Sequence, residues 1–382
     1  MAGRRKHVQD ASRAAEPSAA LNAICPYYTM FPLEFPISVM ETIRSKKKLR
    51  VLDPFCGRGT TIFAARLKGH HAYGIDSSPI AIAIARAKLA EATEADVIAL
   101  AKSILEDQTD AVVPEGEFWE WAYAPDTLTK VCMLRDGLHG LRSDAAKILR
   151  AVCLGALHGP LTKSVATRSY FSNQMPRTFA SKPDYSVRYW KAKELRPVPV
   201  DVLNIIKARV ARLKLDTLPQ CTGRSNVSAG DSRLMRGYAS IPGKIDLAIT
   251  SPPYYGMRTY VADQWLRNWF LGGAADVPYG EKTALSHSSP QAFAESLAQV
   301  WNRVGDRLST DGKLFVRFGA IPSRKANPCE IMQSSLEASD FSWKVRRICE
   351  AESAASGKRQ ASHMGNRVKS VAVVEHDYEI AL

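Results

Sequence analysis

The sequence predicts an α/β fold with a doubly wound, mostly parallel sheet. Three observations predict it: short apolar strands alternate with helical segments early in the chain, this pattern resumes after a long interruption, and strand follows strand near the end. The chain has 382 residues, enough for one large domain or two ordinary ones with a sizeable core. Its content of 46% hydrophobic and 24% charged residues is typical of a folded globular protein.

The first part of the sheet is predicted between residues 50 and 105. Residues 50–53 (RVLD) read as a strand, followed by the glycine-containing loop PFCGRGTT and a helix ending at Gly69. Residues 71–76 (HAYGID) read as a second strand, and 79–105 are rich in Ala and Ile at helical spacing. This order of strand, glycine loop, helix, strand and helix typically opens a doubly wound sheet.

The alternation then stops for more than a hundred residues. This segment holds WEWAYAPDTL, a predicted helix through LRSDAAKILRAVCLGAL, an irregular stretch over 158–200, and a second helix over VDVLNIIKARVARLK. Because such a long loop without a role is uncommon, we expect an inserted, mainly helical subdomain over 107–228. Residues 1–20 are expected to form a flexible tail. The domain that contains the sheet would then comprise 21–106 and 229–382.

The sheet pattern resumes at Gly230-Asp231. Residues 245–250 (IDLAIT) form an apolar strand that is followed directly by SPPYYG, and 291–308 form an amphipathic helix. Further strands are predicted over 313–321, 342–351 and 369–382. Two strands in succession at the end predict an antiparallel terminal hairpin that closes the sheet.

Charge and cysteine content narrow the function classes. There are 52 Lys and Arg against 38 Asp and Glu, a formal net charge of +14, which favours nucleic acid over a membrane as partner. No run of about 18 apolar residues predicts a membrane helix, and the basic N-terminus lacks the apolar core of a secretory signal. The seven cysteines include no C-x-x-C pair, so we expect a cytoplasmic protein without disulfides or a bound metal.

The first candidate site is the loop from Asp53 to Thr61. Glycines permit a tight turn there, and a helix N-terminus offers unpaired N–H groups to a ligand. Asp76 lies 17 residues after Gly59, at the end of the next strand, where a carboxylate can accept hydrogen bonds from ribose hydroxyls. The glycines alone would equally fit an ordinary strand–helix turn.

The second candidate site is the segment from Thr250 to Gly256. Two prolines make its backbone rigid, and a Ser hydroxyl, a carbonyl and a Tyr ring lie together. This set suits a planar heterocycle with an exocyclic amine: the amine would donate to Ser251 and the Pro252 carbonyl, and the ring would stack on Tyr254. A proline-rich turn that caps a strand is the simpler alternative.

Together, DPFCGRGT and SPPY resemble the cofactor loop and the catalytic motif of the S-adenosylmethionine-dependent DNA amino-methyltransferases. The resemblance covers roughly 25–90 and 228–382 and implies a seven-stranded methyltransferase sheet with S-adenosylmethionine as cofactor. In the family, a segment like CPYYTMFPLEFP folds over the methionine moiety, and an acidic residue at the position of Asp231 lies near the adenine. The implied cofactor-binding residues are Tyr28, Met30, Phe31, Asp53, Phe55, Gly57, Gly59, Thr60, Asp76 and Asp231. The implied catalytic residues are Ser251, Pro252, Pro253 and Tyr254.

The residue before Pro-Pro-Tyr bears on the base that is modified. Ser is typical of cytosine-N4 modification in this family, whereas Asp or Asn is commoner for adenine-N6, which stays open as an alternative. An RNA guanine-N2 methyltransferase would usually have Asp at Ser251 and an N-terminal RNA-binding module. A non-catalytic DNA-binding module is disfavoured by the intact motifs. Cytosine-C5 chemistry needs a Pro-Cys pair on the loop that here reads Ser-Pro-Pro-Tyr; Pro328-Cys329 follows a later strand.

The inserted segment is where we expect recognition of double-stranded DNA. Cations can contact phosphates, aromatic rings can stack on displaced bases, and amides can read adenine edges. A solvated charged face is the alternative. The base would be flipped out of the duplex to reach the cofactor. A restriction or phage-defence partner and a solitary role all fit, and neither the target sequence nor the oligomeric state follows from the chain. The predicted DNA-contacting residues are Lys163, Arg168, Asn173, Gln174, Arg177, Lys182 and Arg188.

Overall fold

The computed structural model describes residues 17–27, 31–107, 111–159, 168–174, 182–256, 261–277, 285–319, 326–351 and 375–382. Within these ranges seven strands form one sheet in the order β3-β2-β1-β4-β5-β7-β6. All neighbours pair in parallel except β7, which is antiparallel to both β5 and β6. The predicted fold class is therefore confirmed, including the terminal hairpin. The strands are β1 (Arg50–Asp53), β2 (His71–Asp76), β3 (Ser225–Ala229), β4 (Ile245–Thr250), β5 (Leu308–Gly319), β6 (Lys344–Glu350) and β7 (Glu375–Ala381).

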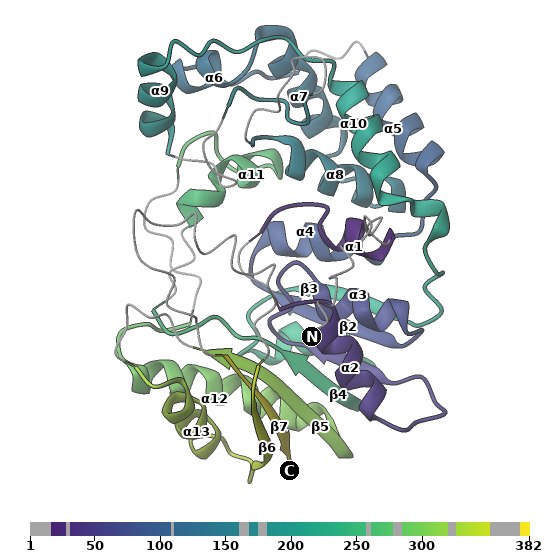
Figure 1. The fold of residues 1–382 in the computed structure, drawn as a ribbon, viewed down its shortest axis with the longest axis vertical. Helices are drawn as coiled ribbons and strands as arrows, with labels where there is room; N and C mark the ends of the chain where they lie inside the picture. The colour runs from purple at the N-terminus through teal and green to yellow at the C-terminus, as the bar shows by residue number, and fades with distance from the viewer. Residues whose placement is uncertain are drawn as a thin grey trace, which may run out of the picture.

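The helices divide into those that flank the sheet and those that form a separate helical layer (Figure 1). Flanking the sheet are α2 (Glu34–Thr42), α3 (Thr60–Leu67), α4 (Pro79–Ala87), α12 (Pro290–Arg307) and α13 (Pro328–Glu337). The helical layer contains α5 (Glu94–Glu106), α6 (Glu117–Ala122), α7 (Pro125–Gly137), α8 (Asp144–Ala156), α9 (Pro183–Ala192), α10 (Val202–Leu213) and α11 (Trp265–Phe270). Helix α1 (Pro17–Asn22) packs against α10 of the helical layer, and its Leu21 is buried in the core of that layer. Short 3-10 turns cover Leu215–Thr217, Met235–Tyr238 and Val261–Gln264.

Each face of the sheet has its own apolar core because successive strand residues point to opposite faces. On β5, Leu314 and Val316 pack in the core that contains α12 and α13, whereas Phe315 packs in the core that contains α2 and α3. On β1, Leu52 packs in the core that contains α12 and α13, and Val51 packs in the core that contains α2 and α3. The sheet is thus covered on both faces, and its ligand-accessible part is the edge where the strands end.

The helical layer has a third core that is rich in aromatic rings. Trp119 lies between the rings of Trp265 and Trp269, with centroids 5.8 and 4.5 Å away. The layer joins the sheet domain where α8 packs on α4. Because α11 follows the Ser-Pro-Pro-Tyr loop and belongs to this core, the layer is tied to the chain directly beyond the second candidate site.

The described residues depart from the sequence prediction at several places. Residues 79–105, expected to form one helical segment, form two helices, α4 and α5. The sheet resumes with β3, before residue 229, and SNVSA has one buried apolar residue, Val227, to mark it as a strand. The prediction that 158–200 is irregular is wrong for α9, where a proline in the first turn starts a helix that buries Val187 and Trp190. Helix α1 begins at Pro17, inside the segment expected to be a tail.

Candidate active site

The two sequence motifs leave the sheet at the same edge, on neighbouring strands. β1 and β4 pair in parallel, with Val51 opposite Leu247 and Leu52 opposite Ala248. The hydroxyl of Thr250, the last residue of β4, donates to Oδ1 of Asp53, the last residue of β1, over 2.6 Å. The glycine loop and the Ser-Pro-Pro-Tyr loop therefore begin side by side.

The glycine loop is held by two carboxylates, of the buried Asp53 and the half-buried Asp76, that accept from backbone N–H groups. Asp53 Oδ1 accepts from the N–H of Phe55 at 3.1 Å. Asp76, at the end of β2, accepts from the N–H of Gly57 at 2.9 Å and from that of Ser78 at 2.8 Å. These bonds fix the loop shape within the protein itself, so its remaining N–H groups are oriented before any ligand binds.

Two glycines of this loop have backbone conformations that other residues rarely adopt. Gly57 has φ +48° and Gly59 has φ +78°, both in the left-handed region. A Cβ on Gly59 would also lie 2.8 Å from Cβ of Ala85 on α4. Gly59 is thus required both by the turn and by the close approach of α4. The following residue, Thr60, is buried at the start of α3.

Burial shifts the acidity of both carboxylates. It raises the pKa of Asp53 to about 6, while hydrogen bonds from Thr250, Thr61 and Phe55 act in the opposite direction. Burial also raises the pKa of Asp76, opposed by bonds from backbone N–H groups. Both carboxylates are therefore held at an energetic cost, which is typical of functional sites.

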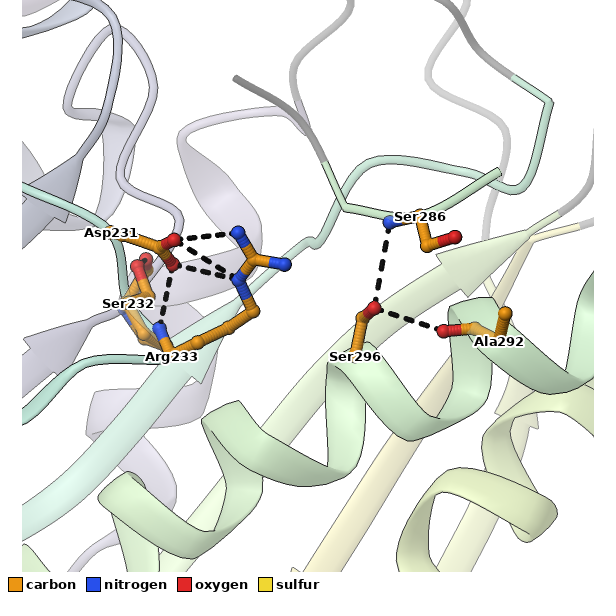
Figure 2. A network of polar contacts seen from close by, with 7 residues as sticks. Asp231, Ser232, Arg233, Ser286, Ala292 and Ser296 are labelled. Carbon is orange, nitrogen blue, oxygen red and sulfur yellow. Dashed lines mark hydrogen bonds and ion pairs between the residues drawn. The ribbon is translucent and has the colours of Figure 1, made fainter. Parts of the chain in front are cut away.

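Asp231 lies beside the same loop but is engaged by its own neighbour. Its carboxylate pairs with Arg233, with Oδ2 2.6 Å from Nη2 and Oδ1 3.0 Å from Nε, as Figure 2 shows. This hydrogen bonding lowers the pKa of Asp231. The N–H of Gly230 donates to the carbonyl of Asp76 at 2.9 Å, and the hydroxyl of Ser232 donates to the carbonyl of Pro54. The structure thus brings Asp231 to the predicted cofactor edge.

The Ser-Pro-Pro-Tyr loop holds its tyrosine inward. Tyr254 is 8% exposed, its ring meets the edge of Phe318 at 5.7 Å, and its hydroxyl donates to Oε1 of Glu375 at the start of β7. Burial raises the pKa of Tyr254 well above its ordinary value, and the Glu375 charge adds to this. Sequence reasoning missed Glu375, because an acidic residue at a strand start is no signal by itself.

The far end of this loop is fixed to α12. The N–H of Gly256 donates to Nδ1 of His287 at 3.1 Å. The segment that carries His287 is in turn held by Ser296 of α12, which accepts from the N–H of Ser286 at 3.4 Å and donates to the carbonyl of Ala292 at 2.9 Å (Figure 2). At the start of the loop, Pro252 is buried and Pro253 is half-buried. Together with the contact of Gly256 at the far end, this holds the loop at both ends.

Some predicted residues lie outside the described residues, namely Tyr28, Met30, Lys163 and Arg177. Phe31 is described: its ring meets that of Phe35 at 5.3 Å, and the Arg317 guanidinium lies 4.1 Å from the centre of the Phe35 ring. Phe55, in the glycine loop, packs against the core on the α12 face. Phe31 and Phe55 therefore border the sheet from opposite faces.

The predicted DNA-contacting residues divide into buried and exposed ones. Asn173 is 2% exposed and its side-chain amide donates to the carbonyls of Trp121 and Leu195, so it works inside the fold and we leave it out of the proposed interface. Gln174 and Arg168 are half-buried, and the Gln174 carbonyl accepts from the Trp190 indole. The remaining described residues are exposed: Lys182 is the N-cap residue of α9, and Arg188 lies on α9.

Within the described ranges, no three or more His, Cys, Asp or Glu side chains gather as metal ligands. Among the described helices, none has the length and apolar character to cross a membrane. All seven cysteines lie in described residues and are free.

Residues 45–118 match a family model described as a methyltransferase domain. This part of the chain, which contains β1, β2 and the helices α3 to α5, is therefore similar to methyltransferases. The match contains the glycine loop, Asp53 and Asp76, and it implies S-adenosylmethionine as the cofactor. It ends before the Ser-Pro-Pro-Tyr loop and therefore leaves the methyl acceptor open.

Solved structures of methyltransferases resemble the chain only weakly. The rRNA methyltransferase aviRa from Streptomyces viridochromogenes matches at 11% identity and a TM-score of 0.35, covering 96% of this chain and 93% of its own. A TehB-like SAM-dependent methyltransferase from Corynebacterium glutamicum matches at 10% identity and a TM-score of 0.29, covering 92% and 87%. Likenesses this weak carry no argument about the acceptor. No curated protein matches the chain.

Proposed function

We propose that this methyltransferase transfers a methyl group from S-adenosylmethionine to the exocyclic amine of cytosine (cytosine-N4) in double-stranded DNA. The observation that carries the proposal is the adjacency of the two loops, joined by the hydrogen bond between Thr250 and Asp53. The Ser at position 251 favours cytosine over adenine through the resemblance stated above.

The glycine loop suits the cofactor. Gly57 and Gly59 allow close approach of the backbone, and the half-buried Asp76 carboxylate has lone pairs beyond those used by Gly57 and Ser78 to accept from ribose hydroxyls. When bound, S-adenosylmethionine supplies a methyl group that is already activated by its sulfonium. The protein then contributes position, because holding two reactants in line is worth on the order of 7–11 kcal/mol.

Ser251 and the Pro252 carbonyl would make the acceptor amine more nucleophilic. The lone pair of the amine is delocalised into the base, so the amine is a poor nucleophile. Hydrogen bonds from its two N–H groups to Ser251 Oγ and to the Pro252 carbonyl would favour a pyramidal nitrogen and free the lone pair. No covalent intermediate on the enzyme is needed.

The substrate proposal includes base flipping, because the amine lies inside the duplex. Extruding the base costs a few kcal/mol, and phosphate contacts can offset this cost. The described residues that we assign to such contacts are two exposed cations, Lys182 at the N-cap of α9 and Arg188 on α9.

The test is methyl transfer from labelled S-adenosylmethionine to duplex DNA, with the product nucleosides separated by chromatography. We expect N4-methylcytosine from the wild type. Ser251→Ala should lower kcat by about 100-fold or more, since it removes a hydrogen bond used in the transition state. Cofactor affinity should change less than about twofold, because Ser251 belongs to the acceptor side. Ser342→Ala, an exposed serine on the way to β6, is the matched control.

Three results would contradict this function. Labelled N6-methyladenine as the product would mean that the acceptor base is adenine. Transfer to RNA but not to DNA would replace the substrate class. Full activity of Ser251→Ala would remove the acceptor site from this loop.

A further inference from the structure

Cys329, at the start of α13, contacts two side chains of β7. Its Sγ lies 4.0 Å from Nδ1 of His376 and accepts a hydrogen bond of 3.3 Å from the hydroxyl of Tyr378. His376 and Tyr378 are two residues apart on one strand, so both point to the face of the sheet where α13 packs. These contacts bring a thiol, an imidazole and a phenol together at one place outside the candidate active site.

The two contacts divide the hydrogen-bonding roles at the sulfur. Burial raises the pKa of Tyr378, so its hydroxyl keeps its proton and donates it to the sulfur. The proton of the Cys329 thiol can then be donated to Nδ1 of His376. A nucleophile next to a base, with a third group oriented on the nucleophile, is the arrangement that activates a thiol. When the proton has moved to the imidazole, both neighbours donate to the thiolate.

The place of Cys329 in its helix favours the thiolate further. Helix α13 has ten residues, and Cys329 is its second, directly after Pro328. The N-terminus of a helix has a partial positive charge, which stabilises an anion in the first turn and lowers the pKa of a thiol there.

Two carboxylates near the thiol have partners of their own. Glu330 accepts from Nδ2 of Asn327 at 3.0 Å. Asp377, which lies between His376 and Tyr378 on β7, forms an ion pair of 2.6 Å with the buried Arg317. These contacts reduce the repulsion that the two carboxylates would exert on a thiolate.

Other cysteines of the chain are placed differently. Burial raises the pKa of the thiols of Cys132 and Cys153 to about 12, so both stay protonated and inert. Cys349 is exposed on the edge strand β6. Cys329 is half-buried, so it combines access for a small reagent with a neighbouring base.

We propose that Cys329 is a reactive thiol with His376 as its base, and that hydrogen peroxide oxidises it to a sulfenic acid. His376 takes the thiol proton, and the thiolate attacks one oxygen of the peroxide, so that an S–O bond forms as the O–O bond breaks. The departing hydroxide takes the proton from the imidazolium and leaves as water. The sulfur loses two electrons and the peroxide gains them. This modification site is independent of the proposed function.

The test measures alkylation of the full-length, ligand-free protein by iodoacetamide at about pH 7, with the rate at each cysteine read from its peptide by mass spectrometry. We expect Cys329 to react at least about fivefold faster than Cys349, although Cys349 is the more exposed. His376→Asn should slow Cys329 by about tenfold and leave Cys349 unchanged, and Tyr378→Phe should slow Cys329 by about threefold. His139→Asn, an exposed histidine of the helical layer, is the matched control and should change neither rate.

Oxidation is measured with hydrogen peroxide followed by a cyclic 1,3-diketone, which forms an adduct with sulfenic acids. We expect the adduct on Cys329 of the wild type and about tenfold less of it in His376→Asn. Protection of Cys132 and Cys153 from alkylation shows that a variant is folded. If His376→Asn loses this protection, His376→Gln takes its place.

Alkylation of Cys329 no faster than that of Cys349 would overturn the proposal. An unchanged Cys329 rate in the folded His376 variant would do the same, because the imidazole would then not act as the base. An adduct on Cys349 but not on Cys329 would mean that exposure alone decides which thiol is oxidised. A wild type that does not methylate DNA would contradict the proposed function and would leave these expectations unchanged.

Discussion

The carboxyl edge of the sheet and helix α9 use their polar side chains in opposite ways. At the edge, Asp53 and Asp76 turn inward and accept from the backbone of the glycine loop. At α9, the N-cap residue Lys182 and the helical Arg188 are exposed to solvent. The edge is thus shaped by contacts within the protein, whereas the start of α9 presents exposed charges on the protein surface. Substitutions at the edge should therefore act by changing the local structure of the loop, and substitutions on α9 by changing the long-range electrostatic attraction of a partner.

The largest effect is expected from Gly59→Ala at the edge. The new Cβ would lie 2.8 Å from Cβ and 2.9 Å from Cα of Ala85, and φ is +78°. We expect affinity for S-adenosylmethionine to fall by at least about 100-fold and the unfolding midpoint to drop, because loop and helix must separate. Calorimetric titration and thermal unfolding check both.

Gly140→Ala is the control from the helical layer. Gly140 also has a left-handed φ, of +72°, but a Cβ there meets nothing within 4 Å. It should cost only the backbone strain of about 1–2 kcal/mol and leave cofactor affinity unchanged. Equal effects of the two substitutions would mean that the contact with Ala85 is unimportant and would weaken the contrast between the two regions.

The residues at the edge of the sheet could be predicted from sequence because most of them lie close together in the chain. Asp53, Gly57 and Gly59 lie within seven residues, and the strand before them places them at the edge. Asp76 could be found because carboxyl ends of parallel strands meet at one edge. Glu375 could not, because antiparallel pairing with a distant strand brings it there.

The helical layer was harder to predict from sequence, because its side chains are placed by contacts between residues far apart in the chain. Asn173 lies among basic residues, a pattern typical of a surface, yet distant carbonyls of Trp121 and Leu195 hold it inside. Helix α9 buries only one side, against a core of residues far away in the sequence, so its apolar positions are few. Where a side chain points here is decided by tertiary contacts, which no local pattern contains.

An intermediate effect is expected from Asp53→Asn, and it depends on pH. Since burial raises the pKa of Asp53 from 3.8 to about 6, the folded state holds this proton more tightly than the unfolded state. The ionised carboxylate therefore costs stability that grows as pH rises from about 4 to 6 and is complete above that. The asparagine oxygen can still accept from Thr250 and Phe55 but carries no charge.

We expect Asp53→Asn to be more stable than the wild type at pH 7.5, by at most about 3 kcal/mol, and the difference to shrink towards pH 4. Urea unfolding of the ligand-free protein at several pH values measures it. The exposed Asp311→Asn is the control for a surface charge change. A variant that is less stable than wild type at pH 7.5 would mean that the edge needs the charge, and not only the hydrogen bonds.

The smallest effect is expected from Arg188→Ala on α9. Arg188 is exposed, and within the described part of the chain its Nε donates only to the carbonyl of Asp184 at 3.2 Å, so the fold loses little. If it contacts one phosphate, DNA affinity should fall about two- to threefold at 0.1 M salt, and the slope of log K against log salt should weaken by about 1. The loss should be the same for all DNA sequences, since phosphates carry no sequence information. Arg346→Ala on β6, at the opposite end of the molecule in Figure 1, is exposed too and should leave the slope unchanged. Equal slopes for wild type and Arg188→Ala would place the phosphate contacts elsewhere than on α9.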